Sequence, residues 1–340
     1  RIKLSRHPNL DWDMTLMGRV VWTGKSSMVI NMSRCMSSPP GVCHIGDEPF
    51  AGDDSCWLHA NFTFVARNRQ EAKAARRETG KSQNISALDL GEERTPDHGR
   101  QGHDGWVALR MLIQAHKDRQ ALERRAGRKG SAAPDDLAKL ELSRSRREAD
   151  ATALAASGFP LLQLPCLADP HAVLVKQTAL SSTLICMPQH RNTANRIFGG
   201  FLMHRAFEVA FCAAFMFGGS RPQFSEIDEV VFLQPIDVGD LVHLDACVLY
   251  TKEAREKGAA PCACVEVLAS VVRPEAVESK VSNRFNLTFS FPELASGRGG
   301  RRAGGEDGPA LRTVLPADAT EASRIVTAKY QDRLLEDLDV

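Results

Sequence analysis

An apolar run over residues 197–217 predicts a buried helix. Only three strongly polar residues interrupt it, so nearly every side of a helix here would be apolar, as in the core of a domain. The Gly218-Gly219 pair follows and predicts the end of the helix. We therefore expect one helix with under about a tenth of its apolar side-chain area exposed.

A membrane span is the alternative for this run, because it approaches the roughly 20 residues that cross a bilayer. His204, Arg205 and Glu208 lie near its middle, and an arginine at that depth costs about 2.5 to 3.5 kcal/mol on insertion scales. The apolar stretch between Arg205 and the glycine pair is also short for a span. We expect no membrane span.

Apolar and alternating segments on both sides of the helix predict strands. In the last of them, Phe285, Leu287 and Phe289 alternate with polar residues, a pattern typical of a strand with one buried face. One strand before the helix and four after it predict an α+β fold in which an antiparallel sheet wraps around the helix. The expected strands cover 175–187, 224–233, 241–250, 262–272 and 283–291.

The first 68 residues predict a smaller set of strands. Residues 15–33 predict a hairpin, and the strand 56–67 would place Leu58, Ala60, Phe62 and Phe64 on one face. Asn61-Phe-Thr-Phe echoes Asn286-Leu-Thr-Phe, which indicates a partial copy of the later sheet without its apolar helix. Such a copy exposes an apolar face, so we expect it to dock against the second domain or a partner chain.

The remaining segments predict linkers and surface helices, with helices expected over 106–125, 134–156 and 318–338. A Gly/Arg-rich stretch after Pro292 is typical of a linker. We therefore divide the chain into an incomplete first domain, a charged insertion, a second domain, and a linker with a C-terminal helix. Their ranges are 1–68, 69–170, 171–292 and 293–340.

Composition narrows the function classes only modestly. The chain has 340 residues, 43% hydrophobic and 25% charged, with a formal net charge of +1, so no basic excess indicates a nucleic-acid partner. Several of the nine cysteines lie in apolar strands, which suits a reducing compartment. Cys35, Cys43, His44 and Cys56 fit no established zinc spacing, so we expect no metal.

The Gly199-Gly200 pair lies where the predicted helix begins, and this position indicates an oxyanion site. A helix N-terminus exposes unpaired N–H groups, and residues without a Cβ let a ligand oxygen approach them. The positive end of the helix dipole there favours developing negative charge. A junction that needs glycine only for packing is the alternative.

Two motifs carry a resemblance to a known family. They are Asn192-x-x-Asn195-x-x-Phe198-Gly-Gly-Phe-Leu-Met and Phe232-Leu-Gln-Pro235-Ile-Asp-Val-Gly239-Asp240, in that order. With them the chain resembles hotdog-fold acyl-CoA thioesterases, most of all the tandem-hotdog mitochondrial acyl-coenzyme A thioesterase 9 group. The match covers 171–292 well and 14–67 more loosely, which implies a tandem hotdog fold with an incomplete first copy.

This resemblance also implies a mitochondrial location and a homo-oligomer. The chain begins with Arg1 and looks truncated, so the location comes from the resemblance alone. The implied reaction is hydrolysis of acyl-CoA to free fatty acid and CoA by direct water attack. Acyl-CoA would be the substrate, and no cofactor is expected because coenzyme A is part of that substrate.

The resemblance assigns roles within the motif. The amides of Gly199 and Gly200 would hold the thioester oxygen, and Asn192 would position water or substrate. In related tandem enzymes a carboxylate on the opposing domain's helix completes the site, and Phe207 stands here where several relatives carry Asp. Glu208 is the remaining carboxylate on this helix, and an ion pair with His204 one turn earlier is its alternative role.

The rest of the substrate would need a cationic rim and an apolar groove. Arg196, Arg205, Arg221 and Arg273 are the candidate partners for the CoA phosphates, and Phe198 and Phe201 are candidates for acyl-chain contacts. Two other functions stay open: a catalytically weak acyl-CoA-binding or assembly subunit, and a hotdog dehydratase or hydratase using His204 and Glu208. The sequence contains no Gly-x-Ser-x-Gly motif, so we do not expect a serine mechanism.

Overall fold

The structure is a computed structural model that describes residues 2–4, 13–23, 27–37, 56–65, 114, 117, 134–164, 166, 168–192, 196–228, 230–253, 260–295 and 311–336. The chain forms two compact units, residues 1–140 and 141–340, and each is described by itself. Of the helix predicted over 106–125, only Gln114 and Lys117 are described, and both are helical. The predicted linker after Phe291 lies largely outside the described residues.

The first unit contains an antiparallel sheet in the order β2-β3-β4-β1. Strands β2 and β3 form the predicted hairpin, and β4 is the predicted third strand, whereas the short β1 was not predicted. Val21, Val29 and Ala60 are buried, but Phe62 and Phe64 are exposed. This part of the predicted apolar face is therefore exposed. The strands are β1 (Ile2–Leu4), β2 (Asp13–Thr23), β3 (Ser27–Ser37) and β4 (Cys56–Val65).

The second unit is built on an antiparallel sheet in the order β7-β11-β10-β9-β6, with β8 also paired to β11. The strands predicted after the helix are confirmed, except that the first of them is divided into β7 and β8. The bounds are β6 (Leu180–Ile185), β7 (Gln223–Ile227), β8 (Val231–Phe232), β9 (Leu241–Lys252), β10 (Cys262–Arg273) and β11 (Glu278–Ser290).

The single strand predicted over 175–187 is wrong at its start. Val175–Thr178 forms a 3-10 turn, η2, and the strand begins only at Leu180. Side-chain hydrogen bonds favour the turn: the Leu174 N–H donates to Gln177 Oε1 at 2.9 Å, and the Thr178 hydroxyl donates to the Val175 carbonyl at 2.7 Å. A pattern of apolar residues does not reveal such local bonds.

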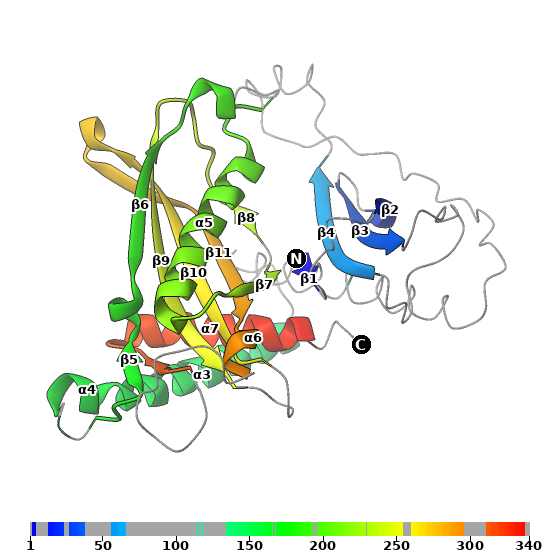
Figure 1. Ribbon diagram of the computed structural model, residues 1–340. Helices are drawn as coiled ribbons and strands as arrows, with labels where there is room; N and C mark the ends of the chain where they lie inside the picture. The colour runs from blue at the N-terminus through cyan, green and yellow to red at the C-terminus, as the bar shows by residue number, and fades with distance from the viewer. Residues whose placement is uncertain are drawn as a thin grey trace, which may run out of the picture. The chain divides into compact units, whose positions relative to one another are not determined.

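Helix α5 (Gly199–Gly218) confirms the predicted central helix. Four alanines, Ala206, Ala210, Ala213 and Ala214, form a buried stripe, and small side chains let the helix approach the sheet closely. On the same side, the rings of Phe207 and Phe211 pack on Phe289 of β11, with Phe285, Leu287 and Phe291 fully buried. Figure 1 shows α5 lying along the strands of this sheet.

The predicted near-complete burial of α5 is wrong. Phe215 and Met216 are 45% and 74% exposed, and the His204 side chain is also exposed. The helix packs on the sheet through one face, so the opposite face stays accessible in this chain. Among the described residues, α5 is the one helix whose length and hydropathy would allow a bilayer crossing, but its packing on the sheet is that of a core helix.

A helical layer joins the segments that flank the second sheet. The charged insertion supplies α3 (Pro134–Ser157) and α4 (Phe159–Gln163), and the C-terminal segment supplies α7 (Ala319–Glu336), close to the predicted bounds. Ala151 of α3 packs with Ala322 and Val326 of α7. Strands β5 (Ala172–Leu174) and β12 (Thr313–Leu315) pair in parallel beside them. Figure 1 shows α3 and α7 crossing the same end of the sheet.

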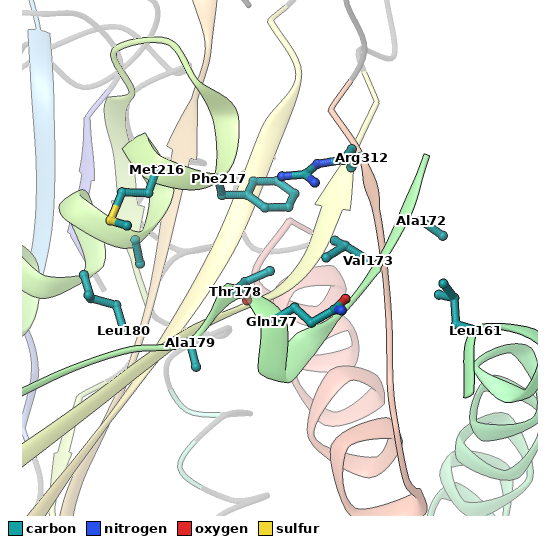
Figure 2. A pocket seen from close by; sticks show the side chains of 11 residues that line it. Leu161, Ala172, Val173, Gln177, Thr178, Ala179, Leu180, Met216, Phe217 and Arg312 are labelled. Atoms are coloured by element: carbon teal, nitrogen blue, oxygen red, sulfur yellow. The ribbon is translucent and has the colours of Figure 1, made fainter. Parts of the chain in front are cut away.

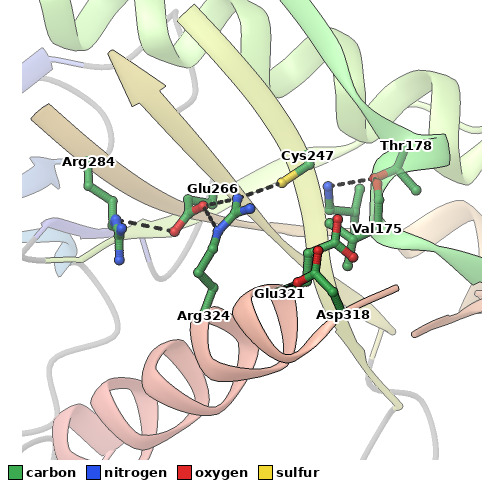
Figure 3. Close-up of polar contacts among 9 residues, drawn as sticks. Val175, Thr178, Cys247, Glu266, Arg284, Asp318, Glu321 and Arg324 are labelled. Carbon is green, nitrogen blue, oxygen red and sulfur yellow. Dashed lines mark hydrogen bonds and ion pairs between the residues drawn. The ribbon is translucent and has the colours of Figure 1, made fainter. Parts of the chain in front are cut away.

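An ion-pair cluster fixes α7 to the face of the sheet opposite α5. Glu266 of β10 is 1% exposed, and its carboxylate accepts hydrogen bonds from Arg324 of α7 and pairs with Arg284 of β11 (Figure 3). The neighbouring Val265 is paired with Leu287 of β11, and the Leu287 side chain lies on the face of the sheet that α5 covers. Successive side chains of a strand point to opposite faces, so Glu266 lies on the other face. Arg324 also lies 3.2 Å from the Cys247 sulfur. The C-terminal helix is thus held on the sheet by a charged hydrogen bond.

Candidate active site

The loop before α5 is closed by Asn192. Its N–H donates to the Arg196 carbonyl at 2.6 Å, and the Arg196 N–H donates to Asn192 Oδ1 at 3.2 Å. Arg191 and Ile197 form a β-bridge just outside this pair. Asn192 is therefore held where the chain turns into the helix, and one of its roles is to shape the loop. Asn195 of the motif lies outside the described residues.

The first turn of α5 leaves two amides open. The N-cap residue is Phe198, which makes no side-chain capping bond, while its carbonyl accepts the N–H groups of Phe201 and Leu202 at 3.0 and 3.4 Å. Within the described part of the chain, the N–H groups of Gly199 and Gly200 have no acceptor. They lie at the positive end of the helix dipole, which suits an anionic or polarised oxygen.

Gly200 also makes room for the ring of Phe198. A Cβ at position 200 would lie 2.4 Å from Phe198 Cε1, far inside contact distance. Phe198 is 58% exposed, so its ring lies over the helix start and faces solvent. The absence of a Cβ at Gly200 thus lets a ligand approach the amides and lets the Phe198 ring lie where it does.

The two sequence motifs meet at this point. The Ile197 N–H donates to the Ile236 carbonyl at 3.0 Å, and the Arg196 guanidinium pairs with Asp237 at 3.2 Å. Two segments separated by about 40 residues in the sequence therefore form one structure around the helix start.

Asp240 anchors this second loop. Its carboxylate accepts the Asp237 N–H at 2.9 Å and pairs with Arg273 at 3.1 Å. Burial opposes ionisation of Asp240, but the hydrogen bonds from Arg273 and the Asp237 amide, with the charges of Arg273 and Arg196, outweigh it and hold its pKa below the usual value. Arg273 is therefore engaged within the loop.

Cys186 joins this network through its backbone. The Cys186 N–H donates to the Asp240 carbonyl at 3.0 Å, and its carbonyl accepts the Gly239 N–H at 2.8 Å. Burial, and secondarily the Asp240 charge, raises the pKa of the Cys186 thiol to about 11. The raised pKa favours the protonated thiol at neutral pH, and the backbone of Cys186 holds the loops together.

His190 is a site neighbour that the sequence reasoning missed. Its ring stacks on Phe201 with centroids 3.7 Å apart and planes 13° from parallel, and its backbone carbonyl accepts the Phe198 N–H at 2.8 Å. The ring nitrogen Nδ1 is buried and has no hydrogen-bond partner among the described residues. Its position two residues before Asn192 was the available signal, but only the fold shows the stacking.

Glu208 lies in an ion-pair cluster on the accessible side of α5. It pairs with His204 at 3.2 Å, as the alternative reading predicted, and with Arg205 at 2.7 Å. Arg205 also lies over the Phe201 ring, 5.4 Å from its centroid. Eight residues of helix separate Glu208 from Gly200, about 12 Å along the axis. Glu208 is therefore remote from an oxygen bound at the glycine amides.

Two other residues lie away from the helix start. Phe207 belongs to the aromatic packing under α5, with its ring edge-on to Phe224 at 5.5 Å. Arg221 follows the C-terminal end of the helix, about 30 Å along the axis from Gly199. The structure thus brings together Asn192, Arg196, Phe198, Phe201 and the two glycines, and leaves Arg221 outside the group.

This chain is similar in sequence to several known proteins. No family model matches it. It is 36% identical to the mitochondrial acyl-coenzyme A thioesterase 4 of Humulus lupulus over 327 residues, 96% of this chain and 53% of that protein. It is 35% identical over the same length to the chloroplastic acyl-coenzyme A thioesterase 2 of that plant, covering 64% of it. The chain thus spans between half and two thirds of the length of these relatives.

A shorter match is with the mitochondrial acyl-coenzyme A thioesterase 9 of Mus musculus, 40% identical over 120 residues, 35% of this chain. Among solved structures, the acyl-CoA hydrolase of Staphylococcus aureus is 22% identical, with 49% of this chain and 91% of that chain covered and a TM-score of 0.40. The long matches confirm the resemblance that the two motifs indicated: by sequence, this chain is a relative of the acyl-coenzyme A thioesterases over nearly its whole length.

Proposed function

We propose that this chain hydrolyses acyl-CoA thioesters to a free fatty acid and coenzyme A by direct attack of water at the N-terminal end of α5. The observation that carries the proposal is the uncapped helix start, where the amides of Gly199 and Gly200 have no acceptor among the described residues. A thioester oxygen placed there would gain charge in the transition state against two preorganised donors. The names of the relatives support the same reaction.

The helix start supplies two of the groups that the reaction needs. Water attacks the carbonyl carbon, and the two amides hold the oxygen of the tetrahedral intermediate. The attacking water gives a proton to the acceptor assigned below. The C–S bond then breaks, and the coenzyme A thiolate leaves and takes up that proton. Asn192 positions the water or the carbonyl with its side-chain amide. No metal, cofactor or covalent enzyme intermediate is part of the proposal.

We assign the proton acceptor to a second hotdog unit. Glu208 lies about 12 Å along the helix from Gly200 and is paired with Arg205 and His204. Asp237 is engaged by Arg196. Apolar side chains exposed on these loops support a facing unit that would cover them. They are Ile185, Met187, Phe198 and Val238.

We propose that residues 1–68 form the incomplete first copy of a tandem, that 69–170 is an insertion, that 171–292 is the second domain, and that the protein assembles as a homo-oligomer. Mitochondrial location is part of the same proposal, supported by a relative with that designation. Arg196, Arg205, Phe198 and Phe201 would contact the substrate.

A catalytically weak acyl-CoA-binding subunit is the second candidate. It is favoured by Phe207, which packs in the aromatic core at a position where the resemblance led us to look for a carboxylate. The two candidates separate in one experiment, a thiol-release assay with a series of acyl-CoAs beside a binding titration. Saturable binding with no release above background would establish the weak binder and overturn hydrolysis.

The assignment of the base is tested in the same assay. We expect Glu208→Gln and Asp237→Asn each to keep the hydrolysis rate within a few-fold of the unmodified chain. A loss of about 10² or more, typical of removing an acid/base group, would make the altered residue the proton acceptor. In that case the division of the site between two units would be wrong.

A further inference from the structure

A cavity of about 510 Å³ lies near the C-terminal end of α5, away from the glycine pair. Its volume is within the range of small-ligand sites, about 300 to 1,000 Å³. It is open to solvent on one side and is lined by elements from both flanks of the second domain, including α4, β5 and η2, together with the residue before β12. Figure 2 shows these side chains around it, among them Leu161, Val173, Leu180, Met216, Phe217 and Arg312.

Two polar side chains of the cavity, Thr178 and Gln177, already make hydrogen bonds within the protein. The Thr178 hydroxyl donates to the Val175 carbonyl at 2.7 Å and accepts the Val248 N–H at 2.9 Å. Gln177 Oε1 accepts the Leu174 N–H at 2.9 Å. These groups hold η2 in place, so they contribute to the wall more than to recognition.

Arg312 is the charged group at this cavity. Its guanidinium lies over the Phe217 ring, 5.6 Å from the centroid, as Figure 2 shows. Within the described residues no carboxylate pairs with it. Its backbone carbonyl accepts the Thr251 hydroxyl at 3.3 Å, so the backbone from which it projects is tied to β9.

We propose that this cavity is a second ligand site that binds a fatty carboxylate, with the carboxylate at Arg312 and the alkyl chain against the apolar walls. A single guanidinium matches one carboxylate, whereas the several phosphates of coenzyme A would need more cations than this cavity offers. The aliphatic and aromatic walls suit an unbranched alkyl chain. The choice of a fatty acid among anionic amphiphiles rests on the proposed function, because that reaction releases one.

The site is separate from the helix start. From Gly200 to Phe217, α5 spans about 25 Å along its axis, and the buried alanine stripe of the helix lies against the sheet between them. A fatty acid bound here would therefore leave the glycine amides accessible to a thioester. The chain would thus bind the product at a place distinct from where it forms.

The experiment is a calorimetric titration of the full chain with decanoate and, as the uncharged match, decanol. Arg312→Gln should weaken decanoate binding at least about tenfold, the loss expected for a charge-assisted bond, and leave decanol binding unchanged. Ala179→Phe, which fills the cavity from an exposed wall position, should weaken both. Arg144→Gln on the exposed surface of α3 is the matched control and should change neither.

Chain length gives a second readout. Affinity should rise by up to about fourfold for each methylene from octanoate to dodecanoate, as for burial of alkyl surface. The proposal would be overturned if decanoate bound equally well to the unmodified chain, Arg312→Gln and Ala179→Phe. It would also be overturned if the one effect of decanoate were to raise the KM of thiol release equally in all three proteins. If no thiol release is measured while the titrations follow the expected pattern, the proposed hydrolysis is wrong, and the cavity is still a binding site for anionic amphiphiles.

Discussion

The two ends of α5 carry the same dipeptide, and the surroundings give it opposite uses. At the N-terminal end, Gly199 and Gly200 have amides without acceptors in the described structure, beneath an exposed phenylalanine. At the C-terminal end, Gly219 adopts a left-handed conformation with φ +66°, and its N–H donates to the Phe215 carbonyl at 3.0 Å. That end of the helix is closed by its own cap.

The two glycine pairs also differ in the side chains that pack against them. A Cβ at Gly218 would lie 2.2 Å from the ring of Phe291, which is fully buried and has no room to move. A Cβ at Gly200 would meet the Phe198 ring, which is exposed and can turn away. The first pair thus leaves polar groups open to a ligand, and the second satisfies the backbone and fills the core. We expect substitutions to affect hydrolysis at one end and stability at the other.

The largest effect is expected for Asn192→Ala. If Asn192 positions water or the carbonyl, thioester hydrolysis should fall by about 10²-fold, as when one polarising group is removed from an active site. The measurement is thiol release with a long-chain acyl-CoA. Asn192→Asp is the control, because it keeps the acceptor for the Arg196 N–H but removes the donor. Full turnover in Asn192→Asp would exclude a role for the side-chain N–H donor of Asn192 at the carbonyl.

Gly218→Val should lower the free energy of unfolding by about 2 kcal/mol, because the new side chain overpacks against Phe291. Hydrolysis per folded molecule should stay unchanged. Chemical denaturation gives the stability, and Gly219→Asn is the matched variant, since asparagine tolerates the left-handed region and no atom lies within 4 Å of a Cβ there. A stable Gly218→Val protein with low activity would reverse the contrast between the two ends.

Gly200→Ala should reduce hydrolysis by about tenfold with little change in stability, because the added methyl displaces the Phe198 ring and hinders approach to the amide. Kinetics in the Phe198→Ala background separate the two causes through a double-mutant cycle. If displacement of the ring is the cause, Gly200→Ala should have no further effect in that background. A further tenfold loss there would place the whole effect at the amide.

The smallest effect concerns Asp240, which anchors the loop facing the first glycine pair. Its pKa is lowered in the folded chain, so its stabilisation is present above the unfolded value of about 3.9 and is lost as pH falls through the folded value. Asp240→Asn should cost less than about 1 kcal/mol at pH 7. This difference should begin to shrink as pH falls below the unfolded value of about 3.9, as thermal unfolding across pH would measure. A difference that grows in acid would contradict the assigned pairing.

Several features of this protein followed from the sequence alone. The apolar run predicted α5, and the alternation of Phe285, Leu287 and Phe289 predicted β11 and the side that faces the helix. Gly218 and Gly219 predicted where the helix ends. These features depend on neighbouring residues and on a regular period, so local physical chemistry is sufficient to specify them. The motif around Asn192 likewise pointed to the family because its residues are close in sequence.

Other features were decided only by tertiary structure. The exposed side of α5 depends on how far the sheet wraps around it, and the pairing of Arg196 with Asp237 joins segments about 40 residues apart. The layer of α3 and α7, and the cavity at Arg312, require the two flanks of the second domain to meet. No sequence period encodes contacts between distant segments, because each one depends on the packing of all the elements between them.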